Sequence, residues 1–244
     1  MKFDTAVDEI RKHLVFLKET GCSMIDLRQT SIDIIRGWGD GNLERPPKKL
    51  DPAGKTISTF LSDVFDGFSK CRRCGLSEKR EVSVFGAGPQ KALLMFIGFV
   101  PELADVRTGQ PYTGDEGELL TRIIGAMKLE RNSVYICHAV KCLPQANRIP
   151  NKWEAKACRY HLLRQIDAIR PKVICVLGES AAGILLEQDM PISRMRGSFY
   201  YHEGIPVMPT YDLAHLLAHP SAKRLVWEDI QKVINTLSTM TDSV

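Results

Sequence analysis

The chain lacks long hydrophobic runs, a regular cysteine framework and a strong excess of one charge. No stretch of 18 apolar residues occurs, so no membrane span is predicted. The first residues, MKFDTAVDEIRKHL, do not contain the apolar segment of a secretory signal. Seven cysteines without framework spacing indicate a reducing cytoplasm rather than disulfides. A net charge of +4 is compatible with a polyanionic partner but is too small to establish one.

The chain does have enough apolar sequence for one substantial core, since 44% of its 244 residues are hydrophobic. Apolar residues recur at helical spacing in residues 3–19, and further short helices are predicted at 30–38 and 56–68. The segment 39–54, GDGNLERPPKKLDPAG, is rich in glycine, proline and charge, which is typical of a linker. The sequence therefore predicts a single domain with an N-terminal attachment.

Four of the seven cysteines are spaced as metal ligands would be. Cys71 and Cys74 form a C-x-x-C, which supplies two thiolates from one tight turn. Cys142 and Cys158 are too far apart in sequence to form the second close pair of a zinc ribbon, so the fold must bring them together. Four thiolates gathered in this way fit an iron–sulfur cluster better than zinc. Two alternatives stay open: ordinary buried thiols and a zinc-stabilised protein.

After Cys74, short apolar runs alternate with amphipathic stretches. Four runs have the pattern of strands buried on both faces: 92–98, 134–140, 173–178 and 205–208. Helices are predicted at 117–127, 153–169, 180–186 and 221–237. This alternation predicts an α/β fold with a parallel sheet covered on two sides, whose ligands bind beyond the carboxyl ends of the strands. The first of these loops, 98–120, is rich in glycine and proline, which predicts irregular backbone before its helix begins.

The motifs from about Lys70 to Leu237 resemble those of the family 4 uracil-DNA glycosylases, which carry a [4Fe–4S] cluster. The resemblance rests on CRRC, VFGAGPQKALLMFIG, RTGQPYTGDEGELL, VYICHAVKCLP, EAKACRYHLLRQIDAIRPKVICVLG, MRGSF, and PTY followed by PSAKRLVWEDI. It implies a three-layer α/β/α sandwich around a four-stranded parallel sheet, with residues 1–69 as a helical extension and linker and 70–244 as the glycosylase-like domain. It also implies DNA, single-stranded DNA included, as the partner. The implied cluster ligands are Cys71, Cys74, Cys142 and Cys158.

The chain departs from the family at three of its four main catalytic positions. Phe99 stands where the family has the glutamate that positions water, and His138 replaces the asparagine that reads the base edge. Asp212 stands where the family has the histidine that supports the departing base. Only the stacking aromatic is kept, as Tyr112. The family's uracil chemistry therefore does not carry over unchanged.

Each departure predicts a role. Asp212 is the candidate catalytic carboxylate, which would assist water or the sugar cation, and His138 is a candidate for both catalysis and base-edge contact. Tyr112 would stack on the base, and Phe99 would either close the base pocket or stack within it. An alternative register puts His219, of the His-Pro-Ser at 219–221, in the catalytic slot, but the flanking motifs agree only when Asp212 occupies it.

DNA contacts are predicted around the last loop and helix. Leu216 and Leu217 are candidate wedges for insertion into DNA, while Lys223, Arg224 and Arg196 are candidates for phosphate contact. Each basic residue could instead belong to an ordinary solvated surface.

The predicted function is a monofunctional DNA glycosylase that hydrolyses the N-glycosidic bond of uracil or another deaminated base. Its activity would be altered or weak because three motif residues are replaced. The alternative is a non-catalytic iron–sulfur protein that binds nucleic acid and kept the glycosylase scaffold.

Overall fold

The computed structural model describes residues 67–68, 70–78 and 80–241, which all belong to the second of the chain's two units, Lys55–Val244. The helices and the linker predicted before residue 67 lie outside the described residues. A domain boundary after residue 69 therefore stays a prediction. Among the residues that are described, no helix combines the length and the apolar character that a membrane span requires.

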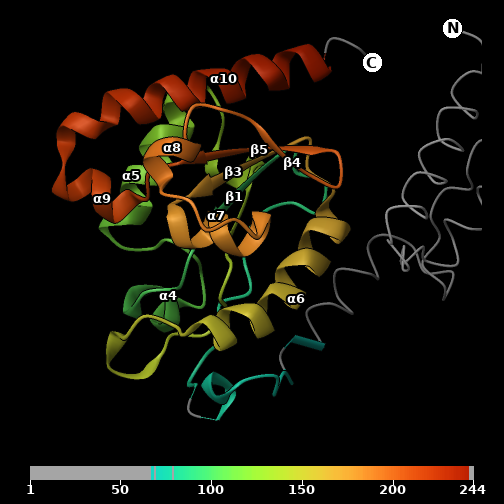
Figure 1. The fold of residues 1–244 in the computed structure, drawn as a ribbon, viewed down its shortest axis with the longest axis vertical. Coiled ribbons are helices and arrows are strands. Elements are labelled where there is room, and N and C mark those ends of the chain that lie inside the picture. The colour runs from blue at the N-terminus through green and yellow to red at the C-terminus, as the bar shows by residue number, and fades with distance from the viewer. Residues whose placement is uncertain (1–66, 69, 79, 242–244) are drawn as a thin grey trace, which may run out of the picture. The chain divides into compact units, whose positions relative to one another are not determined.

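The centre of the domain is a five-stranded sheet in the order β2-β1-β3-β5-β4 (Figure 1). Its strands are β1 (Leu94–Gly98), β2 (Tyr135–His138), β3 (Val173–Leu177), β4 (Tyr200–His202) and β5 (Ile205–Thr210). The four predicted strands are all present and parallel, as expected. The predicted strand number is wrong by one, because the three-residue β4 pairs antiparallel with β5 at the edge.

Helices cover both faces of the sheet, which confirms the three-layer architecture (Figure 1). One face carries α5 (Asp115–Ala126), α9 (Leu213–Ala218) and α10 (Lys223–Thr241). The other carries α6 (Lys152–Ile169), α7 (Glu179–Leu186) and α8 (Ile192–Met195). Strand side chains alternate between the two cores: Leu94 and Phe96 of β1 face the first, while Met95 and Ile97 face the second. All of β1 is buried, which explains its uninterrupted apolar sequence.

One short helix interrupts the loop that follows β1. The sequence predicts irregular backbone there, but α4 spans Leu103–Thr108 and ends at Gly109 in the left-handed conformation. Glu102 and Asp105 form a reciprocal capping box at its first turn. The cap fixes the position of Asp105, whose side chain is buried.

Candidate active site

The carboxyl ends of the parallel strands meet at one edge of the sheet. There Gly98 at the end of β1 lies in register with His138 at the end of β2, and Leu177 of β3 lies in register with Thr210 of β5. Asp212 follows directly as the N-cap of α9. The fold therefore brings His138 and Asp212 to the same edge, which is where ligands bind in sheets of this kind.

His138 is a buried, neutral imidazole held by a carboxylate. Its Nε2 lies 3.0 Å from Oδ2 of Asp105, and the residue is 1% exposed. Burial lowers the pKa of His138, although Asp105 opposes that shift. Burial alone would raise the pKa of Asp105, but the hydrogen bonds from His138 and from the Thr113 and Glu102 backbones bring it to about 2. An ionised carboxylate only accepts hydrogen bonds, so the proton of the neutral imidazole lies on Nε2.

The other ring nitrogen of His138 is a bare acceptor. Nδ1 is buried and has no hydrogen-bond partner within the described part of the chain. It faces Gly98, since a Cβ built on that glycine would lie 2.9 Å from Nδ1. The Tyr112 ring covers His138, with 4.6 Å between ring centroids. Because a buried polar atom without a partner is costly, Nδ1 is the atom of this site most in need of a ligand.

Tyr112 is held in an unusual backbone conformation, with φ of +55°. Its hydroxyl would lie 1.9 Å from a Cβ on Gly98, and its carbonyl would lie 1.8 Å from a Cβ on Gly117. Both positions therefore require glycine. Burial raises the pKa of the Tyr112 hydroxyl, and the charges of Glu116, Asp105 and Asp212 raise it further. The hydroxyl thus lies among carboxylates.

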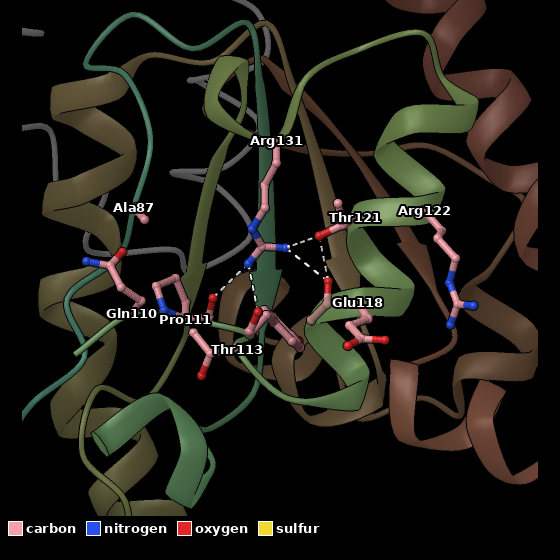
Figure 2. A pocket seen from close by; sticks show the side chains of 10 residues that line it. Ala87, Gln110, Pro111, Thr113, Glu118, Thr121, Arg122 and Arg131 are labelled. Atoms are coloured by element: carbon pink, nitrogen blue, oxygen red, sulfur yellow. Dashed lines mark hydrogen bonds between the residues drawn. The ribbon is translucent and has the colours of Figure 1, made fainter. Parts of the chain in front are cut away.

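Arg131 fixes the Tyr112 turn from behind. Its guanidinium donates to the carbonyls of Pro111 at 2.9 Å and Tyr112 at 2.8 Å, and to the Gly117 carbonyl at 3.1 Å. It also donates to the Thr121 hydroxyl at 2.9 Å. Figure 2 shows this side chain reaching down between the Pro111 loop and α5, in the wall of a cavity of about 610 Å³. Four acceptors on one planar group make the turn rigid.

Three carboxylates lie around the mouth of the site. Burial raises the pKa of Glu116 to about 8, with further contributions from the charge and hydrogen bond of Glu102 and from the charge of Asp212. Glu116 is therefore largely protonated at neutral pH. Asp212 accepts a hydrogen bond from the backbone N–H of His215 at 2.6 Å through Oδ1, while Oδ2 lies against Gly178. One oxygen of Asp212 caps α9 and the other faces the edge of the sheet.

Phe99 packs among apolar side chains. Its half-buried side chain packs against two apolar clusters, one between the sheet and α6 and α7, and one that contains Cys74, Cys142 and Cys158. This environment favours the interpretation of Phe99 as an apolar plug. A base-stacking role for it stays a prediction.

Two of the predicted DNA contacts need correction. Leu216 is only 1% exposed and packs in the core beside α5 and α10, so it is not a surface wedge. Arg196 donates to both carboxylate oxygens of buried Asp229, at 2.7 and 3.1 Å, and to the Leu225 carbonyl. Its guanidinium therefore anchors α10 and is not free for phosphate. Leu217 is 40% exposed.

The remaining predicted phosphate contacts, Lys223 and Arg224, lie at the surface at the start of α10. Arg224 donates to Glu228 at 2.8 Å. Exposed pairs of this kind contribute little to stability, so the guanidinium can exchange partners.

The four predicted cluster ligands come from distant parts of the sequence to one region of the fold. Cys74, Cys142 and Cys158 belong to one buried apolar cluster. Burial raises the pKa of the Cys142 thiol, and the neighbouring Cys74 and Cys71 contribute to that rise. However, no group of three or more His, Cys, Asp or Glu side chains in the described segments has its atoms placed to hold a metal ion. The cysteines are therefore neighbours without coordination geometry.

The surroundings of these thiols fit an anionic cluster. The backbone N–H of Lys141 donates to Sγ of Cys158 at 3.3 Å. Nε2 of His161 lies 3.0 Å from Sγ of Cys71. The Arg80 guanidinium lies 3.9 Å from Sγ of Cys142.

Lys141 is fully buried, and its ammonium group donates to the neutral amide of Gln165. A buried cation with a neutral partner is costly unless negative charge lies nearby. Four thiolates around iron would supply that charge.

Comparison with known proteins identifies the family to which the chain belongs. Residues 85–231 match the family model of the uracil DNA glycosylase superfamily. The Type-4 uracil-DNA glycosylase of Saccharolobus solfataricus is 38% identical over 188 residues, which are 73% of this chain and 87% of the relative. That of Thermotoga maritima is 36% identical over 181 residues, 72% of this chain and 94% of the relative. The chain belongs to the type-4 uracil-DNA glycosylase family.

Within this type-4 family member, sequence reasoning missed three residues of the site: Asp105, Glu116 and Arg131. Asp105 lies 33 residues from His138 in sequence, so their contact is created only by the fold. Glu116 could have been noticed as one of the acidic residues DEGE at the predicted helix start. Arg131 belongs to no quoted motif, and a lone arginine before a strand carries no signal of its own.

Proposed function

We propose that this family member is a cluster-containing DNA glycosylase that acts on deaminated bases through an altered pocket. Membership of the family supports the general reaction, since relatives carry the name Type-4 uracil-DNA glycosylase. The observation that carries the altered specificity is the unpartnered Nδ1 of His138. The replaced motif residues make this a different site from that of the named family, so its base preference follows from its own side chains.

The tautomer of His138 favours a base that presents an N–H at its Watson–Crick edge. Uracil N3, hypoxanthine N1 and xanthine N1 each carry a hydrogen, which Nδ1 can accept. Cytosine N3 and adenine N1 carry lone pairs instead and would repel Nδ1. Cytosine or adenine would leave the buried Nδ1 without a hydrogen bond, and a site of this kind discriminates strongly against such bases. Because Nδ1 is covered by Tyr112 and Gly98, the Tyr112 ring must move aside for a flipped base to reach it.

Hydrolysis breaks the bond between the base nitrogen and C1′ of the sugar, and the bonding electrons leave with the base. The oxygen of a water molecule then bonds to C1′, and one proton of that water passes to a general base on the protein. Asp212 is the proposed acceptor of that proton, because its Oδ2 faces the sheet edge while Oδ1 is held by the α9 cap. Glu116 is protonated at neutral pH and is the proposed donor to the departing base.

Cys71, Cys74, Cys142 and Cys158 would hold the [4Fe–4S] cluster. When bound, the cluster would act as a structural clasp that joins the segment before β1, the segment after β2 and α6. Three N–H donors or cations around the sulfurs, from Lys141, His161 and Arg80, suit such a group. Cytoplasmic location and DNA, single-stranded DNA included, as the partner are parts of the same proposal.

The test is cleavage of single-stranded oligonucleotides that carry one uracil, hypoxanthine, xanthine or 3-methyluracil. We expect cutting at one or more of the first three after alkaline treatment and none at 3-methyluracil, whose methyl group replaces the N–H. Asp212→Asn should reduce the rate by about 100-fold or more. Cutting of 3-methyluracil at the same rate as uracil would contradict the role of His138.

One observation favours the non-catalytic alternative. Glu102 and Asp212 lie near Glu116, the proposed donor to the departing base, and each of these two carboxylates, when ionised, opposes the negative charge that forms there. A chain that binds DNA with strong salt dependence and cuts none of the four oligonucleotides would establish this alternative in place of the glycosylase.

A further inference from the structure

Three aromatic rings form a continuous stack along one side of α9. The rings of Tyr211 and His215 have centroids 4.7 Å apart with 16° between their planes. His215 and His219 follow at 4.5 Å and 24°. The spacing of four residues places the three rings on one line of the helix surface. We call Tyr211, His215 and His219 the ring stack.

The ring stack is rigidly supported. Leu213 and Leu216 of α9 are buried in the core, and Tyr211 packs against the same cluster, which fixes how the helix lies. The ring of His219 is oriented by a contact of 3.3 Å between its Nδ1 and the His215 carbonyl. Pro220 follows at once and begins a short 3-10 helix, which limits the freedom of the backbone at this point.

The stack has one exposed end. Tyr211 and His215 are half-buried, and the Arg196 guanidinium lies over the Tyr211 ring at 6.0 Å from its centroid. His219 at the other end is exposed, as is its neighbour Leu217. A planar aromatic face that ends a pre-formed stack is suited to receive one more ring.

We propose that His219 receives a nucleobase of single-stranded DNA, which extends the ring stack by one member. This rests on the proposed function, since it assumes that the chain binds DNA. Every base has an aromatic face, so such stacking needs no particular sequence. The stack begins at Tyr211, directly after β5 and beside Asp212, and ends two ring spacings further on at His219, so the stacked base would belong to the strand that enters the site. Lys223, at the start of α10 just beyond, is placed to meet the adjoining phosphate.

Leu217 is the single wedge candidate that is left, because Leu216 is buried. Leu217 lies two residues from both His215 and His219, so its exposed side chain leaves α9 on a different side from the rings.

The experiment uses the full chain and a single-stranded oligonucleotide that carries 2-aminopurine next to the uracil. Fluorescence anisotropy gives Kd, and quenching of 2-aminopurine reports stacking. The variants are His219→Ala, His219→Phe and, as the matched control, His202→Ala. His202 lies in β4 and pairs with Ile205, at the far end of β5 from α9. Thermal unfolding of each variant confirms that it is folded.

We expect His219→Ala to weaken binding about fivefold or more and to remove the quenching. His219→Phe should keep both within about twofold, because it retains an aromatic face. His202→Ala should match the wild type. The slope of log Kd against log salt should be the same for His219→Ala as for the wild type, because stacking releases no counterions.

The outcomes separate this inference from the proposed function. If the wild type binds DNA but His219→Ala binds and quenches equally well, the ring stack has no such role and the proposed function stands. A salt slope reduced by about one in His219→Ala would mean a phosphate contact and would also overturn the inference. No binding of DNA by the wild type would overturn both.

Discussion

At the scale of single residues, the site depends on which atoms carry protons. Asp105 and His138 settle one proton on Nε2, which leaves Nδ1 as an acceptor. Glu116 and Glu102 keep another proton between two carboxyl groups. The family's asparagine could present both a donor and an acceptor, whereas His138 in this state presents one acceptor. His138 would therefore select among bases both because its Nδ1 is an acceptor and because it has no donor to offer the base.

The raised pKa of Glu116 makes stability depend on pH. Its pKa is about 8 in the folded protein against an ordinary value of 4.5, so the folded state binds the proton more tightly. The resulting stabilisation is complete below pH 4.5 and is lost as the pH rises to 8 and above. Glu116→Gln stays neutral and should be more stable than the wild type at pH 9 by about 1–2 kcal/mol, after allowance for solvent screening.

Urea unfolding at pH 5 and pH 9 measures this effect. The two proteins should have nearly equal stability at pH 5, where Glu116 is protonated in the folded state. Glu118→Gln is the matched control, because Glu118 is exposed on the same helix. A difference at pH 9 that is equally large for Glu118→Gln would assign the effect to general charge repulsion.

The Asp105–His138 pair gives a second prediction at this scale. Asp105→Asn can donate a hydrogen bond to Nε2, which would move the imidazole proton to Nδ1 and turn the acceptor into a donor. We expect this variant to lose uracil binding while it stays folded. A one-bond NMR experiment on the histidine nitrogens checks the tautomer directly, and an Nε2-protonated His138 in the variant would contradict the argument.

At the scale of elements, the turn that carries Tyr112 depends on its supports in α4, in α5 and before β2. Arg131 provides four hydrogen bonds, and Gly117 allows the Tyr112 carbonyl to approach α5. Arg131→Ala should therefore destabilise the protein by about 2–3 kcal/mol, because it leaves carbonyls without their charged donor. Tyr112 should also become mobile, with a weaker near-ultraviolet circular dichroism signal.

Arg122→Ala is the control for the Arg131 prediction. Arg122 lines the same cavity but points away from the Tyr112 turn (Figure 2). Its removal should change stability by less than about 0.5 kcal/mol. Equal losses for the two variants would mean that the cavity wall, rather than the four hydrogen bonds, is what matters.

The same scale explains what the sequence could predict. The four parallel strands were predictable because each is apolar on both faces, and three of the four long helices were found within three residues at each end. α4 and α9 were missed because six residues are too few for a periodic pattern. That omission caused the error at Leu216: had α9 been expected, the spacing of Leu213 and Leu216 would have indicated the buried face.

The contacts that define the site were beyond reach of the sequence for a different reason. Tyr112, His138 and Asp212 were identified as site residues by their place in motifs, but their partners are set by tertiary contacts. Arg196 looked like a surface cation in sequence and proved to be an anchor for α10 through Asp229. The sequence gives the charge of a basic residue, but it does not show which residue that charge contacts in the fold.

At the scale of the whole molecule, the sulfur-rich region joins segments that the sheet alone does not connect. The segment with Cys71 and Cys74 packs near the end of β2 through Cys142 and near α6 through Cys158. The described hydrogen bonds between these segments are few, and one of them is the contact of His161 with Cys71. A group that bonds all four sulfurs would replace weak contacts with a cross-link, and the buried Lys141 would gain a counter-charge.

This argument predicts the behaviour of the cysteine variants. Protein purified without oxygen should be brown, absorb near 400 nm and contain about four iron atoms per chain. Serine at Cys71, Cys74, Cys142 or Cys158 should each reduce iron content and lower the unfolding temperature, whereas Cys175→Ser, at a buried thiol of β3 outside this region, should leave the iron content unchanged. The four single variants should lose similar stability, because breaking any one corner opens the same cross-link. If the protein contains no iron and the four variants lose stability only in proportion to the burial of each cysteine, the cysteines are ordinary buried thiols. If the protein is colourless and contains zinc, it is a zinc-stabilised protein.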